Sequence, residues 1–119
     1  MNKIITIMAF TSACREGKLE VAKEIYKLGS LTNVEINDCF EYSCVKGHLE
    51  VAKWLLSIPN NKININADND WVFRFSCVND QLEVVKWLLS ITKYDNIIVN
   101  LIVPIIKNEQ MAFRYLICV

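Results

Sequence analysis

The chain has 119 residues, of which 53% are hydrophobic, and it carries 13 basic and 13 acidic residues. This length is typical of one domain that buries about two-thirds of its unfolded surface, and the apolar content excludes a disordered chain. The charge balance excludes the strongly basic surface of nucleic-acid-binding proteins, so we expect no nucleic-acid partner.

The N-terminal segment 1–14, MNKIITIMAFTSAC, combines one lysine, an apolar stretch and small residues, as a weak secretion signal would. Thr6 and Thr11 interrupt the apolar stretch, and residues 10–14 match a pattern that recurs later in the chain. A removable peptide has no reason to match that pattern, so we assign the segment to the folded domain. No run reaches the ~20 apolar residues of a membrane-spanning helix, and we expect no membrane association.

Three segments share one register: FTSACREGKLEVAKEIYKL at 10–28, FEYSCVKGHLEVAKWLLSI at 40–58 and FRFSCVNDQLEVVKWLLSI at 73–91. Their offsets are 30 and 33 residues, and a more divergent fourth copy at 102–118 follows with an offset of 29. Periods in this range predict a solenoid, in which each unit buries its apolar face against its neighbours.

Each copy predicts two short helices joined by a turn. In the second copy, Phe40 and Cys44 lie in a compact first helix, and Gly47 marks the turn because glycine adopts backbone angles that other residues avoid. Residues 48–56 then carry apolar side chains at helical spacing. The linkers 32–38, 60–70 and 93–100 alternate polar and β-branched residues, which predicts extended fingers or hairpins.

A helix, turn, helix and protruding hairpin every ~33 residues resembles the ankyrin repeat. The resemblance is most specific at GHLEVAKWLLSI, residues 47–58, and is closest in style to the divergent arrays of large DNA viruses of amoebae and of protists. It implies an all-α repeat solenoid of about four ankyrin-like helix-turn-helix units with hairpin or finger loops, in a single domain over residues 1–119. The repeats are expected at approximately 1–30, 31–62, 63–95 and 96–119.

The chain departs from the common family pattern at several positions. The usual T-P-L-H opening is absent, so we expect Asn37 or Asp38, and Asp70, to cap the first helices of the second and third copies. Asp80 replaces the glycine of the other turns, which predicts a strained or reshaped turn. Pro104 falls within the first helix of the fourth copy, which makes that copy the most divergent.

The five cysteines indicate thiols in a reducing compartment, and we therefore expect a cytoplasmic protein, in the host cytoplasm if the chain is viral. Cys14, Cys44 and Cys77 occupy one equivalent position and are expected to be buried in inter-repeat packing. Packed helices lie about 8–10 Å apart, which is too far for these sulfurs to share a zinc ion or to form a disulfide. We predict no metal site and no cofactor.

His48 is the only histidine, and it lies at the turn between the two helices. The repeat places no serine, cysteine or carboxylate to act with it, so we expect a local capping role and no enzymatic activity. Trp54 and Trp87 share a position at which the first copy has Glu24. We expect these tryptophans to pack against the preceding repeat, and an aromatic binding stripe is the alternative.

Arrays of this type are interaction modules, so the resemblance implies a protein partner bound through finger tips and the first-helix surface. The candidate partner-binding residues are Arg15, Glu41, Lys46, Asn69, Asp70, Arg74 and Asn79.

The alternative function is that of a self-assembling structural fragment of a longer array, which associates through its apolar C-terminal end. That end carries Met111, Phe113, Leu116, Ile117 and Val119 and few charges. A homodimer formed through this end would hide the apolar surface without leading to fibres.

Overall fold

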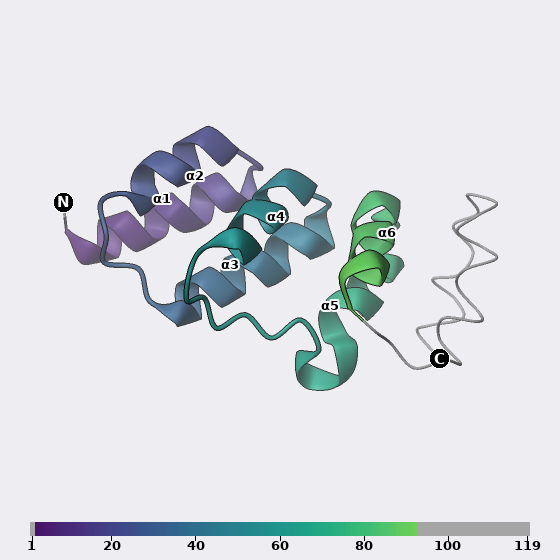
Figure 1. The fold of residues 1–119 in the computed structure, drawn as a ribbon. Coiled ribbons are helices and arrows are strands. Elements are labelled where there is room, and N and C mark those ends of the chain that lie inside the picture. Colours follow the sequence, from purple (N-terminus) through teal and green to yellow (C-terminus); the bar gives the residue numbers. More distant parts are fainter. Residues whose placement is uncertain (1, 93–119) are drawn as a thin grey trace. The chain divides into compact units, whose positions relative to one another are not determined.

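Helices make up all of the regular secondary structure in residues 2–92, the part of the chain that the computed structural model describes (Figure 1). Six helices follow one another along this part, and it contains no strand. The predicted all-α class is therefore confirmed. The chain divides into two compact units, Met1–Asn64 and Ile65–Val119. The expected fourth repeat, 96–119, lies outside the described residues, as does its apolar C-terminal end.

The first unit consists of two helix pairs. Helix α1 (Lys3–Arg15) packs against α2 (Leu19–Tyr26), and α3 (Asn33–Lys46) packs against α4 (Leu49–Ser57). The two pairs are joined where α1 and α3 lie side by side (Figure 1). Two consecutive helix-turn-helix elements thus occupy the positions of the first two sequence copies.

The sharp turn within each helix pair contains a residue with a left-handed backbone conformation, that is, a positive φ angle. Gly17, between α1 and α2, has a φ of 72°, and Gly47, between α3 and α4, has a φ of 82°. Glycine adopts this conformation without a steric penalty because it has no Cβ atom. Asp80 adopts the same conformation in the second unit, with a φ of 58°. That turn is therefore strained but not reshaped.

The two described linkers do not form the expected hairpins, and the third predicted linker, 93–100, lies outside the described residues. Residues 33–38 form the first turns of α3, so the finger prediction is wrong there. Helical spacing buries Ile36 on the same face as Cys39 and Phe40, whereas an extended strand would have placed Cys39 on the opposite face from Ile36 and Phe40. Residues 58–66 are irregular and contain no strand, so the second linker is not a hairpin either.

A capping box determines where α3 begins. The backbone N–H and the hydroxyl of Thr32 both donate to the carboxylate of Glu35, and the Thr32 side chain in turn accepts from the backbone at that position. These contacts satisfy N–H groups that have no partner within the helix. Neither Asn37 nor Asp38 is the cap, because both lie inside the helix.

Equivalent residues of the two pairs build the core of the first unit. Phe10 of α1 and Phe40 of α3 are completely buried, and so are Ala22 of α2 and Ala52 of α4. The small alanines allow the second helix of each pair to approach the first closely. The shared register of the sequence copies therefore corresponds to a shared register of burial.

The second unit is described through one further pair, in which α5 (Ala67–Val78) packs against α6 (Leu82–Ile91). Phe73 and Val85 are fully buried at the positions that correspond to Phe40 and Ala52. The third sequence copy therefore forms the same kind of helix pair as the first two.

The start of α5 differs from the prediction. Asp68, Asn69 and Asp70 have left-handed backbone angles, with φ values of 52°, 58° and 59°. Asp70 therefore lies within α5, and Asn66, which precedes the helix, makes no capping hydrogen bond with its side chain. Asparagine and aspartate are the non-glycine residues that adopt this region most readily. The Arg74 guanidinium stabilises the turn, since it donates to the carbonyl oxygens of Asn69 at 3.0 Å and of Asp68 at 3.5 Å.

Candidate functional site

Trp54 packs against the first helix pair. Its ring lies 5.7 Å from the ring of Tyr26 in a perpendicular arrangement and 6.1 Å from the ring of Phe10. Val51, on the same helix, is 1% exposed, whereas its counterpart Val21 in the first pair is 48% exposed. The second pair has a helix pair before it in the unit, and this neighbour accounts for the difference in burial.

His48 connects the turn of the second pair to the end of α1. Its Nε2–H donates to the backbone carbonyl of Arg15 at 2.8 Å, because a carbonyl oxygen can only accept. Arg15 is the last residue of α1, where carbonyl groups have no partner within the helix. The imidazole also lies against Gly17, where a Cβ atom would approach His48 Nδ1 to 2.6 Å. His48 therefore caps the neighbouring pair rather than its own helix.

The cysteines at the shared register position are all buried. Cys14 is 1% exposed, and Cys44 and Cys77 are completely buried, each in the first helix of its own pair. Burial raises the pKa of the Cys44 thiol above its usual value, and the charge of Glu41 raises it further. Cys44 therefore remains a neutral thiol near pH 7. Within residues 2–92, no three histidine, cysteine or carboxylate side chains are grouped in a way that could hold a metal ion.

Two cations from different helices meet at one aromatic ring. The Arg15 guanidinium of α1 lies 5.1 Å from the centre of the Tyr42 ring of α3, and the Lys46 ammonium lies 5.7 Å from it. Cations at these distances are attracted by the electron-rich ring. We call the surface formed by Ile7, Thr11, Arg15, Tyr42 and Lys46 the α1–α3 face.

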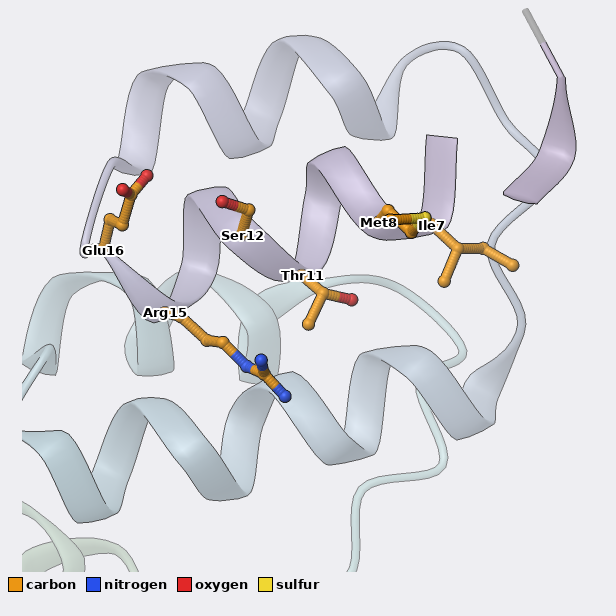
Figure 2. Close-up of a pocket in the computed structure, with 6 residues that line it drawn as sticks. All are labelled: Ile7, Met8, Thr11, Ser12, Arg15 and Glu16. Carbon is orange, nitrogen blue, oxygen red and sulfur yellow. The ribbon is translucent and has the colours of Figure 1, made fainter. Parts of the chain in front are cut away.

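A pocket of about 460 Å³ opens along the α1 side of this face (Figure 2). Thr11 and Arg15 point from α1 towards α3, while Met8 and Ser12 follow the adjacent row of the same helix (Figure 2). The pocket lining is completed by Ile7 and Glu16. The pocket thus has an apolar end near Ile7 and Met8 and a charged end near Arg15.

The carboxylates next to these residues in the sequence, Glu16 and Glu41, have partners of their own. Glu16 pairs with Lys18 at 3.4 Å, and Glu41 accepts a hydrogen bond from the Asn37 amide at 2.7 Å. Arg15 and Lys46 are therefore exposed cations at the α1–α3 face that form no ion pair among residues 2–92.

The candidate residues divide between the two units. In the first unit the structure brings Arg15 and Lys46 to the same ring, and it places Glu41 next to that ring in the sequence of α3. The four candidates of the second unit have mainly local partners.

Among those four, Arg74 and Asn69 are linked by the hydrogen bond at the start of α5, and Asp70 accepts from the Asn66 amide at 2.8 Å. Asn79 donates to the carbonyl oxygen of Phe75 at 2.8 Å and so caps the end of α5. These four residues stabilise their own helix and form no common site of the kind seen at Tyr42.

Tyr42 is the residue that sequence reasoning missed. The equivalent residues of the other two copies are Ser12 and Phe75, so the repeat position of Tyr42 does not suggest a contact with two cations. The available signal is the spacing from Tyr42 to Lys46, because residues four apart share one face of a helix. No local signal indicates that Arg15, on another helix, reaches the same ring.

The chain matches no protein-family model, and comparison with curated proteins and with solved structures identifies no similar protein. Among residues 2–92, no helix has both the length and the apolar character needed to cross a membrane.

Proposed function

We propose that the chain is an ankyrin-like repeat module that binds a partner protein through the α1–α3 face. The repeat assignment is supported by three sequence copies that coincide with three helix pairs of matching burial. The solenoid arrangement, the cytoplasmic location and the absence of catalysis belong to the same proposal. His48 supports the non-enzymatic part, because its Nε2–H is engaged by the carbonyl of Arg15.

The observation that carries the proposal is the Arg15–Tyr42–Lys46 cluster beside the pocket of α1. Tyrosine and arginine are over-represented among the residues that dominate protein–protein binding energies. A carboxylate of a partner would gain two cations that have no ion pair within the described residues. Apolar side chains of the same partner would fit against Ile7 and Met8.

The test is affinity capture from an extract of the cells in which the protein occurs, with the full chain as bait. Tyr42→Ala and Arg15→Ala are compared with the native chain, and Lys53→Ala is the matched control because Lys53 is exposed on α4. Circular dichroism verifies that each variant keeps its helices.

We expect the native chain and Lys53→Ala to retain the same protein, and the two face variants to lose it. Each loss should correspond to a drop in affinity of about 10-fold or more, as at an interface hot spot. Retention of the same proteins by folded Tyr42→Ala and Arg15→Ala would show that binding, if any, uses another surface.

A further inference from the structure

Cys14 and Cys39 face each other across the contact between α1 and α3. Cys14 lies on the buried face of α1 with Phe10 and Ala13, and Cys39 lies on the buried face of α3 with Ile36 and Phe40. The two helices pack together, and the thiols are 1% and 3% exposed. Two sulfur atoms from different helices therefore share one buried interface.

Neighbouring contacts hold the two helices in this register. Arg15, the residue after Cys14, reaches the ring of Tyr42, which lies one helical turn after Cys39. Thr11, one turn before Arg15, interacts with the Cys39 thiol, and the two thiols interact directly with each other. The proximity of Cys14 and Cys39 is thus a consequence of how α1 and α3 dock.

We propose that Cys14 and Cys39 are a modification site, and that a peroxide converts them into a disulfide that links α1 to α3. This proposal is independent of the proposed binding function. It concerns a pair of thiols that the repeat register does not match, because the first-pair counterpart of Cys39 is Ala9.

The chemistry requires one peroxide and both thiols. Cys39 loses its proton, and its sulfur attacks one oxygen of hydrogen peroxide; the O–O bond breaks and the departing hydroxide is protonated to water. The Cys14 sulfur then attacks the Cys39 sulfenic acid, an S–S bond forms, the S–O bond breaks, and the hydroxyl leaves as water with the Cys14 proton. Two thiols and one peroxide give one disulfide and two waters, so the sulfurs supply the two electrons.

The surroundings assign different roles to the two sulfurs. The hydrogen-bonding interaction with the Cys14 thiol lowers the pKa of Cys39, and Thr11 and Arg15 lower it further, while burial and the charge of Asp38 oppose them. The interaction with Cys39 and burial raise the pKa of Cys14. Within this proposal we assign Cys39 as the sulfur that reacts first with peroxide and Cys14 as the sulfur that resolves the intermediate.

Cys44 provides a comparison within the same helix. It is as deeply buried as the other two thiols, and burial raises its pKa. Peroxide that reaches this interface should therefore react at Cys39 in preference to Cys44. The resulting bridge closes a loop of residues 14–39 and should raise the thermal midpoint by on the order of 10 °C, the amount expected for a loop of this length.

The experiment treats the reduced full chain with hydrogen peroxide, blocks the remaining thiols and maps the linked peptides by mass spectrometry. The native chain is compared with Cys39→Ala and Cys44→Ala. Cys39→Ala introduces the residue that the first pair carries at this position, so we expect it to fold, and circular dichroism checks this.

We expect a Cys14–Cys39 link in the native chain and in Cys44→Ala, with a mass lower by two hydrogen atoms, a raised thermal midpoint and reversal by dithiothreitol. Cys39→Ala should form no such link. If Cys39→Ala fails to fold, the peptide map of the native chain decides the question by itself. The proposal is overturned if the native chain shows sulfinic acid at Cys39 without a link, unmodified thiols, or links to Cys44 that are equally abundant.

Discussion

Replacement of Trp54 by alanine should destabilise the first unit substantially. Trp54 is half-buried on α4 and contacts Tyr26 of α2 and Phe10 of α1, so its ring bridges the two helix pairs. Its removal leaves a cavity at the junction of three helices that are part of one core. The predicted loss therefore comes from packing between the pairs.

The magnitude follows from the area and the ring contacts. A packed tryptophan buries roughly 150–250 Å², and a half-buried one loses about 100 Å² on truncation, which corresponds to about 2.5 kcal/mol. Each of the two aromatic contacts adds about 0.5–1.5 kcal/mol. We expect a decrease of about 3.5–5.5 kcal/mol in the free energy of unfolding, a large share of the 5–15 kcal/mol that is typical of a domain.

Urea unfolding followed by circular dichroism measures this loss. Lys53→Ala, at the exposed neighbouring position, is the control and should change the stability by less than about 0.5 kcal/mol. A double-mutant cycle with Tyr26→Ala should give a coupling energy of about 1 kcal/mol. A Trp54→Ala chain that is as stable as Lys53→Ala but has lost its partner would refute the packing role and favour an aromatic binding stripe.

Three further changes test the turn, a buried hydroxyl and a buried thiol. Gly17→Ala should lower the free energy of unfolding, measured with urea, by about 2 kcal/mol or more, because the position has a φ of 72° and the new Cβ atom would clash with His48. Adding His48→Ala to this variant should recover the part of the loss that comes from the clash. Ser43→Ala should be neutral or stabilise the protein by up to about 1 kcal/mol, because the buried Ser43 hydroxyl has no hydrogen-bond partner among the described residues. The first helix pair already has alanine, Ala13, at this position. A clear loss of stability would indicate that the hydroxyl does have a partner. The raised pKa of Cys44 contributes stability that is fully present below the thiol's ordinary value of 9.0 and is lost as the pH rises above it. Cys44→Ala should therefore reduce the decrease of the unfolding free energy at alkaline pH by up to about 1.4 kcal/mol per pH unit. An unchanged dependence of the unfolding free energy on pH would contradict the role of burial.

The local pattern was sufficient to predict the helix pairs and their turns. Apolar residues recur at helical spacing in three copies, and Gly17 and Gly47 mark the turns, so the elements follow from short-range preferences. The same level of reasoning failed for residues 33–38, where alternating β-branched residues suggested an extended finger. The helix prevails there because the Thr32–Glu35 box caps it and because burial of Ile36 extends the apolar face.

The contacts between helix pairs required the tertiary structure. His48 reaches the carbonyl of Arg15, Arg15 reaches the ring of Tyr42, and Cys14 and Cys39 are both buried on helices that pack together. A repeat register identifies equivalent residues, but it does not show which residue of one pair faces which residue of the next. That pairing depends on how far α3 is shifted and rotated against α1, which is decided by the packing of whole helix faces rather than by the sequence near any one residue.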